Sequence, residues 1–281
     1  MWEWVWCKKL WKDSTIVAFA ILGIVSSVFT VVGVSIGDIL AYGFNTTIDD
    51  IGWATRFFYF VASYAVLLLT TVIQKTLNLK NGITLKIRGI QVNINQGDIF
   101  STLNWKVIPL TESFDVHVDD VVIARNSLHG KFIERLNANE LNEVIKLIEI
   151  DYQKFEDKRS KPGKRCKRPL GHVIPYNGYM MLAFTRFDDN QAHLSYSDYI
   201  KCLLEMWKSI SRHYAHKPIV LPLLGSGITR FDDRHEISKT ELLECMLSTL
   251  KTSSENINQP ITILLTEEVI KEINLYKLKG V

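Results

Sequence analysis

The segment from Pro218 to Phe231, PIVLPLLGSGITRF, indicates the fold class of this chain. Its first half is an apolar run of strand length, and the turn Gly225-Ser226-Gly227 follows it. Ser238 and Glu241 then predict the start of a helix, because they have the spacing of a capping box. A buried strand that leads through glycines towards a helix is typical of α/β proteins that bind phosphate, since glycine exposes backbone N–H groups to an anion.

The glycine turn matches neither of the two common nucleotide-binding motifs. Arg230 stands where a dinucleotide-binding fingerprint has its third glycine. No Gly-Lys-Ser/Thr follows the turn, as it would in a Walker loop. An ordinary connection between a strand and a helix is therefore an alternative to an anion site.

Two long apolar segments lie near the amino terminus. Residues 14–36 carry no charged side chain, and residues 57–73 form a second uncharged run that extends further if Arg56 reaches the lipid surface. About 20 apolar residues in a helix cross about 30 Å of hydrocarbon. We therefore predict two transmembrane helices, over about residues 14–36 and 53–73. Two buried core helices are one alternative, and a cleaved signal peptide, which has a shorter apolar region, is the other.

The residues that flank these segments predict their orientation. Aromatic residues prefer the membrane interface, and positive residues stay on the cytoplasmic side. The flanking tryptophans are Trp2, Trp4, Trp6, Trp11 and Trp53. The flanking basic residues are Lys8, Lys9, Lys12, Lys75, Lys80, Lys86 and Arg88, whereas the connecting loop carries Asp38, Asp49 and Asp50. We expect a multi-pass protein of the cell inner membrane with both termini in the cytoplasm.

Residues 1–80 thus form a membrane domain, and residues 81–281 are long enough for one cytoplasmic domain with its own core. The net charge of +3 is too small to indicate nucleic-acid binding. Neither the four cysteines nor the seven histidines show the spacing of a metal site, and no disulfide framework is indicated. The basic stretch over residues 154–168 is either a solvated loop or a patch that faces anionic lipid.

Strand and helix patterns alternate in the second domain, which predicts an α/β fold with parallel neighbouring strands. The expected strands cover residues 83–88, 90–94, 105–110, 121–124, 173–176, 179–185, 219–224 and 261–265. The expected helices cover residues 131–136, 140–155, 197–214 and 238–250, and a last helix starts at residue 267. Asn177-Gly178 predicts a hairpin between two of the strands.

The order of the motifs resembles the macro domain, a mixed sheet flanked by helices that binds ADP-ribose. In that family a Gly-Asp-Ile turn binds adenine, which implies that the Asp98 carboxylate accepts from the adenine amino group and that Ile99 contributes its backbone amide. A helix N-cap is the alternative role of Asp98. The resemblance also implies a loop that wraps the diphosphate, with Phe231 packed on the ribose. That loop is Leu224, Gly225, Ser226, Gly227, Ile228, Thr229, Arg230 and Phe231.

The first loop departs from the hydrolytic macro domains, which carry an Asn-Ala-Ala-Asn segment followed by a run of glycines. Here Thr111 and Glu112 follow the strand, and only Gly130 remains of the glycine run. The corresponding later segment is Ser127, Leu128, His129, Gly130 and Lys131. This difference favours a receptor over an enzyme, and a general-base role of His129 is the alternative.

Two membrane helices before such a domain resemble the macro-domain effectors of bacterial Thoeris antiviral defence. The resemblance implies that a partner TIR-domain protein makes an ADP-ribose-containing signal, expected to be a conjugate with histidine. It also implies that the macro domain binds this signal, that protomers assemble, and that the assembly disrupts the membrane and causes abortive infection. No cofactor besides the signal is implied. The alternatives are a membrane-anchored ADP-ribosyl hydrolase and a scaffold without a ligand.

Overall fold

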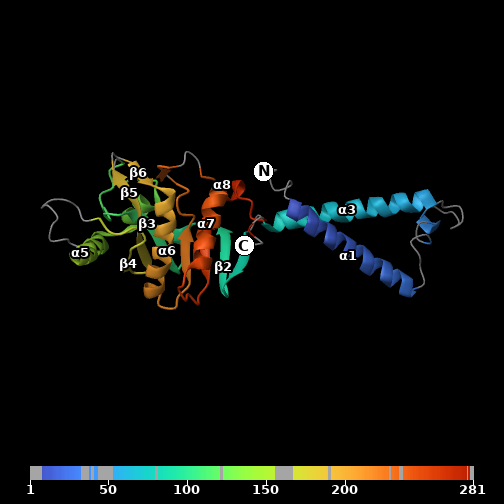
Figure 1. Ribbon diagram of the computed structural model, residues 1–281, viewed down its shortest axis with the longest axis horizontal. Coiled ribbons are helices and arrows are strands. Elements are labelled where there is room, and N and C mark those ends of the chain that lie inside the picture. The colour runs from blue at the N-terminus through green and yellow to red at the C-terminus, as the bar shows by residue number, and fades with distance from the viewer. Residues whose placement is uncertain are drawn as a thin grey trace. The chain divides into compact units, whose positions relative to one another are not determined.

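The computed structural model describes residues 8–32, 38, 41–43, 53–79, 82–120, 123–155, 167–188, 191–227, 229–233, 237–276 and 278. The chain divides into two compact units (Figure 1). The first comprises Met1–Asn81 and Asn274–Lys277, and the second comprises Gly82–Ile273 and Leu278–Val281.

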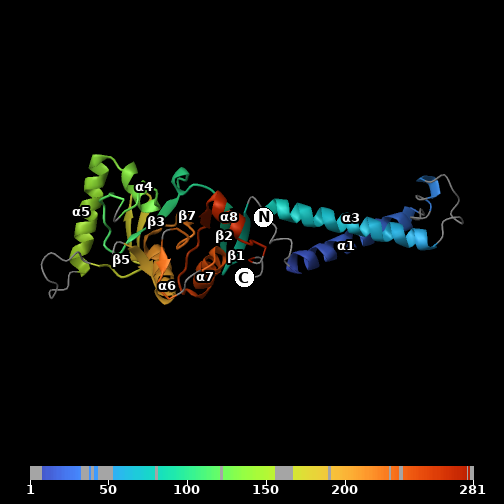
Figure 2. The ribbon, with the colours of Figure 1, turned by 90° about the horizontal axis from the view of Figure 1, so that it is seen from above.

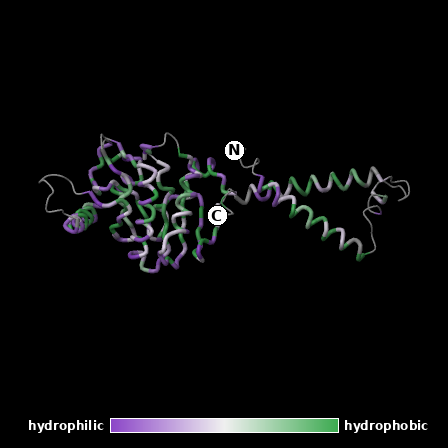
Figure 3. Tube along the Cα trace, in the orientation of Figure 1, coloured by the Kyte–Doolittle hydropathy of each residue, from purple (hydrophilic) through white to green (hydrophobic). Residues whose placement is uncertain are grey.

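The first unit contains two long apolar helices, α1 (Lys8–Val32) and α3 (Trp53–Leu79). They pack together, with the rings of Phe19 and Tyr64 4.7 Å apart between centroids. Both are long and apolar enough to cross a membrane. Only 11% of the apolar stretch of each helix is buried within the protein. In Figure 3 the traces of these two helices are mostly coloured as hydrophobic or intermediate residues. This exposure differs from that of a soluble core helix and is compatible with lipid contact.

As far as its residues are described, the second unit is built on a nine-stranded mixed sheet in the order β1-β2-β9-β7-β3-β5-β6-β8, with β4 paired to β5. The strands are β1 (Ile83–Ile87), β2 (Ile90–Gln96), β3 (Trp105–Thr111), β4 (Val173–Tyr176), β5 (Tyr179–Asp188), β6 (Gln191–Leu194), β7 (Ile219–Pro222), β8 (Arg230–Phe231) and β9 (Ile261–Leu265). The neighbours from β2 through β9, β7 and β3 to β5 are parallel. The predicted α/β class with parallel neighbours is therefore confirmed.

Helices cover both faces of this sheet. They are η2 (Ile99–Ser101), α4 (Leu128–Arg135), α5 (Ala138–Phe155), α6 (Tyr196–His213), α7 (Lys239–Thr252) and α8 (Glu267–Glu272). Figure 2 shows α4 and α5 across the sheet from α6 and α7. Side-chain caps fix where the helices begin, since the Ser127 and Ser238 hydroxyls accept from the amides of Gly130 and Glu241.

The expected strand over residues 121–124 is wrong for Ile123 and Ala124, which lie in a loop, whereas residues 121–122 lie outside the described residues. The Asp119 and Asp120 carboxylates accept from the amides of Ile123 and Arg125, at 3.4 and 2.8 Å. Aspartates that bond to nearby backbone in this way favour turns over strands. The short strands β6 and β8 were not predicted.

Candidate functional site

A cavity of about 810 Å³ lies in the second unit, where the carboxyl ends of the parallel strands meet. Its lining includes the carboxyl ends of four strands and the residues that follow three of them, namely residues 96–100 from the end of β2, 109–111 of β3, 222–227 from the end of β7 and 264–269 from the end of β9. Ligands of open α/β sheets bind outside the carboxyl ends of the strands. The volume is also within the range of about 300–1,000 Å³ that is typical of small-molecule sites.

The cavity brings together three segments that are far apart in the sequence and that the motifs predict to form one site. The predicted residues that line it are Asp98, Ile99, Thr111, Ser127, Leu128, His129, Lys131, Leu224, Gly225, Ser226, Gly227 and Thr229. Ile228, which was predicted with them, lies outside the described residues. The geometry therefore gives one place at which a single elongated ligand would meet all three segments.

Asp98 is both the N-cap of η2 and a residue of the cavity wall. Its Oδ1 atom accepts from the Phe100 amide at 3.1 Å. Its Oδ2 atom has no hydrogen-bond partner within the described residues, and the side chain is exposed. The capping role and the adenine-binding role are therefore compatible, because each uses a different oxygen.

The two glycines of the turn are needed for different reasons. Gly225 has φ +83°, and an added Cβ would lie 3.1 Å from the Phe231 ring, so a side chain is disfavoured by both backbone conformation and packing. Gly227 is exposed, outside the left-handed region, and an added Cβ would have nothing within 4 Å. Only Gly227 thus serves the purpose expected from sequence, which is to leave open space beside the backbone for an anion.

Arg230 and Phe231 do not line the cavity, and they instead fix the end of the glycine turn. They form β8, which pairs with β6, and the Arg230 guanidinium donates to the Gln191 amide oxygen at 3.0 Å. The Phe231 ring meets the Tyr199 ring edge-on at 5.6 Å, beneath Gly225. We therefore assign Phe231 to support of the turn rather than to contact with a ribose.

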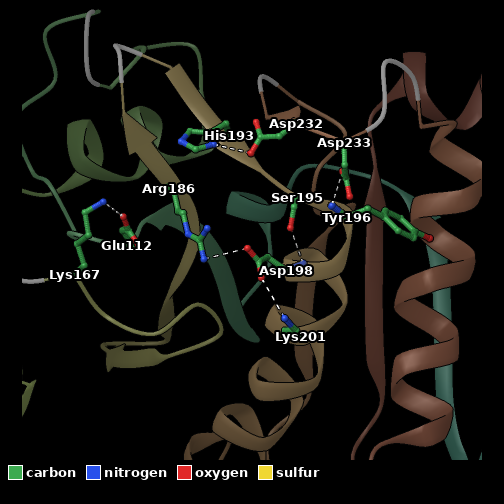
Figure 4. A network of polar contacts seen from close by, with 10 residues as sticks. All are labelled: Glu112, Lys167, Arg186, His193, Ser195, Tyr196, Asp198, Lys201, Asp232 and Asp233. Carbon is green, nitrogen blue, oxygen red and sulfur yellow. Dashed lines mark hydrogen bonds and ion pairs between the residues drawn. The ribbon is translucent and has the colours of Figure 1, made fainter.

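The residues after β8 continue this support. Figure 4 shows Asp232 beside His193 of β6 and Asp233 beside the backbone of Tyr196. The Asp232 carboxylate lies 2.9 Å from the His193 ring, and the Asp233 carboxylate accepts from the Tyr196 amide at 2.8 Å. The carboxyl side of the turn is thereby held to β6 and to the start of α6.

Glu112 was predicted to contact the ligand, but it does not line the cavity. It is 5% exposed, and its carboxylate lies 2.7 Å from the Lys167 ammonium, as Figure 4 shows. Glu112 lies in the turn that follows β3, and the ion pair with Lys167 holds its carboxylate away from the cavity.

Gly130 was predicted to organise the ligand as the remnant of a glycine run. It does not line the cavity, and an added Cβ would lie 2.4 Å from the Ala124 carbonyl oxygen and 2.9 Å from the Arg125 Cα. Glycine is therefore required at this position so that α4 can pack closely on the preceding loop.

His129 is 7% exposed and its Nε2 atom lies 2.8 Å from the Asp115 carbonyl oxygen. Because a carbonyl only accepts, Nε2 carries the proton and Nδ1 does not. Burial lowers the pKa of His129 to about 3. The imidazole is therefore neutral near pH 7, carries no charge for a phosphate, and is a weak general base.

This burial predicts a pH-dependent stability. The folded pKa of His129 lies below the ordinary value of 6.5, so the unfolded chain binds more protons and the free energy of unfolding falls as the pH falls from 6.5 towards 3. His129→Gln keeps a donor for Asp115 and does not titrate. We expect a shallower fall of the thermal midpoint between pH 7 and pH 4.5 in this variant, measured on the detergent-solubilised chain. The exposed His117→Gln is the control, and equal slopes in wild type and His129→Gln would contradict the assignment.

The cavity wall carries the basic side chains Lys131, Arg135 and Lys239 together with the acidic side chains Asp98, Glu267 and Glu268. Lys131 lines the cavity from α4, and the Arg135 guanidinium stacks 3.9 Å from the centroid of the Phe100 ring. Lys239 also lines it, and its ammonium donates to Glu272 at 2.7 Å. The α4 side of the cavity thus carries positive charge, whereas on the α7 side Lys239 is paired with Glu272.

Comparison with known proteins identifies similar sequences and folds. The family described as "Thoeris protein ThsA, Macro domain" matches residues 92–266. The Thoeris protein ThsA of Bacillus amyloliquefaciens (strain Y2) is 40% identical over 209 residues, which cover 71% of this chain and 70% of that protein. The Oceanobacillus iheyensis macrodomain with ADP is 12% identical, with a TM-score of 0.48 over 71% of this chain and 94% of that chain. A mutant of that macrodomain with ADPR is also 12% identical, with a TM-score of 0.47 over 71% and 96% of the two chains.

Proposed function

Because the chain belongs to the ThsA macro-domain family of Thoeris proteins, we propose that it is a membrane-bound receptor for an ADP-ribose-containing signal in antiviral defence. The family match extends from β2 to the start of α8 and so includes the strands whose carboxyl ends surround the cavity. The membrane part of the proposal is supported by the two apolar helices of the first unit.

The observation that carries this proposal is the convergence of the three predicted segments on one cavity. The Asp98 Oδ2 atom accepts from the adenine amino group. The diphosphate lies on the backbone amides of residues 225–227, next to the open space at Gly227. Thr111 and residues 127–131 contact the distal ribose and whatever group it carries.

A receptor is favoured over a hydrolase by the state of His129. Hydrolysis needs a group that takes a proton from water, and such a base works best when its pKa is near the working pH. The pKa of His129 is lowered to about 3, and its Nε2 atom is already bonded to the Asp115 carbonyl. We therefore propose that the start of α4, which contains His129, shapes the distal end of the cavity without chemical attack on the ligand.

The proposed output is assembly in the inner membrane. A partner TIR-domain protein supplies the signal, expected to be a conjugate of ADP-ribose with histidine, and binding causes protomers to associate. One pair of apolar helices cannot surround an aqueous pore, so damage to the membrane requires many pairs together. For a nearly complete switch from separate protomers to the assembly, the ligand must bind the assembled state more tightly than the separate protomers by about 5.5 kcal/mol.

Calorimetry on the detergent-solubilised full chain tests this function. We expect binding of ADP-ribose, tighter binding of its histidine conjugate, and recovery of both ligands unchanged from the mixture. Absence of binding to either ligand would contradict the receptor and favour the scaffold alternative. Release of free histidine from the conjugate would instead support the hydrolase.

The orientation of the membrane helices gives a separate prediction. The lysines in the first turns of α1 and at the end of α3 should hold both chain ends inside, so a reporter enzyme fused at either terminus should show cytoplasmic activity. This orientation is required because the signal is made in the cytoplasm. Periplasmic activity of a reporter at the carboxyl terminus would contradict the proposed topology.

A further inference from the structure

The glycine turn rests on a cluster of aromatic side chains from α6 and β8. Tyr199 of α6 is fully buried, and its ring meets the rings of Phe184 and Phe231 edge-on at 6.0 and 5.6 Å. The centroid of the Tyr196 ring lies 6.4 Å from that of the Phe231 ring. Because an added Cβ at Gly225 would contact the Phe231 ring, this cluster lies directly beneath the turn.

The Tyr199 hydroxyl bonds to the backbone of the turn itself. It donates to the Leu224 carbonyl oxygen at 3.0 Å and lies 3.4 Å from the Leu242 carbonyl oxygen. Burial raises the pKa of Tyr199 well above its usual range, so the hydroxyl keeps its proton and stays a donor at every physiological pH. The Leu224 carbonyl is therefore held towards the protein interior.

This bond determines the direction of the next backbone amide. A trans peptide is planar, and its C=O and N–H groups point in opposite directions. The described residues contain no cis peptide, and Leu224 and Gly225 both line the cavity. With the Leu224 carbonyl turned towards Tyr199, the Gly225 N–H points to the cavity side. Within the described part of the chain, this N–H has no backbone acceptor.

The turn needs such a restraint because glycine adopts many backbone conformations. Without a bond to the Leu224 carbonyl, the peptide between residues 224 and 225 could rotate, and the Leu224 C=O and the Gly225 N–H would exchange directions. The carbonyl oxygen would then face the cavity and repel a phosphate. A donor fixed on a buried helix selects the orientation that presents an N–H.

We infer that Tyr199 is a positioning residue for phosphate binding, because its hydroxyl orients the peptide between Leu224 and Gly225 so that the Gly225 N–H faces the anion. Tyr199 does not itself line the cavity. The inference rests on the proposed function, in which the diphosphate of the ligand lies on this turn.

The substitution Tyr199→Phe in the full chain tests the inference, because it keeps the ring and removes only the hydroxyl. The probes are ADP and adenosine, which share the adenine and ribose but differ in the phosphates. We expect the affinity for ADP to fall by about tenfold, which is the size of one hydrogen bond to a charged group. The affinity for adenosine should not change, and its binding also shows that the variant is folded.

Tyr214→Phe is the matched control. Tyr214 follows α6, is 4% exposed, does not line the cavity, and donates its hydroxyl to the Asn258 side-chain oxygen at 2.9 Å. This variant loses a buried hydroxyl of the same kind, and its affinity for both probes should equal that of wild type. An equal loss of ADP and adenosine binding in Tyr199→Phe, or no loss of either, would overturn the inference. If the wild-type protein bound neither free ADP-ribose nor its histidine conjugate, the proposed function itself would be overturned, and not only the role of Tyr199.

Discussion

Replacement of Gly227 by glutamate is expected to weaken binding of ADP-ribose by more than about a hundredfold while the protein stays folded. The fold should tolerate the side chain, because Gly227 is exposed, lies outside the left-handed region and has open space where a Cβ would stand. The new carboxylate would then lie beside the diphosphate. Two like charges 4 Å apart repel by about 4 kcal/mol at an effective dielectric constant of about 20, which exceeds the energy of a hundredfold change.

Calorimetry on the full chain measures this loss, and the thermal midpoint shows whether the variant is folded. Gly227→Ala is the matched control, because it adds a Cβ in the same open space without charge. We expect it to bind within a few-fold of wild type. A folded glutamate variant with unchanged affinity would exclude the glycine turn from the site.

Disruption of the apolar helices α1 and α3 is expected to abolish the killing of host cells in the presence of the proposed signal. The protein should still bind the signal. A chain that starts at residue 81 keeps the sheet and the cavity of the second unit but lacks α1 and α3. It also loses Asp13, whose carboxylate accepts from the Tyr276 hydroxyl at 2.5 Å within the first unit. The effect is measured as growth, followed after infection, of cells that carry the proposed partner TIR protein.

A substitution in the complete chain separates membrane insertion from loss of the first unit. Val66 of α3 is 60% exposed, and an arginine at the centre of a membrane helix costs about 2.5–3.5 kcal/mol on insertion. Val66→Arg should therefore reduce killing strongly, whereas Val66→Leu should kill like wild type. Killing by the soluble part alone would contradict membrane disruption as the mechanism.

Much of the fold follows from short-range patterns in the sequence. The serine at position 238 caps α7, and Asn177 and Gly178, with φ of +39° and +80°, form the turn between the antiparallel strands β4 and β5. The two apolar segments form the long helices α1 and α3. Each of these features depends on residues within a few positions of one another, so it is written in local sequence. The expected strand at Ile123 and Ala124 was wrong although the bonds that oppose it are also local, because the amides of Ile123 and Arg125 donate to the Asp119 and Asp120 carboxylates and favour a turn.

The sequence by itself determined the fold class, the two apolar helices and three segments of a candidate site. Only the tertiary structure decided which residues of those segments reach the cavity. Glu112 and Phe231 face away from it, Gly130 permits helix packing, and burial makes His129 neutral. Tyr199 supports the glycine turn through a hydrogen bond to Leu224, which lies 25 positions further along the chain. Such roles depend on which distant groups a side chain meets after folding, and no local pattern encodes those contacts.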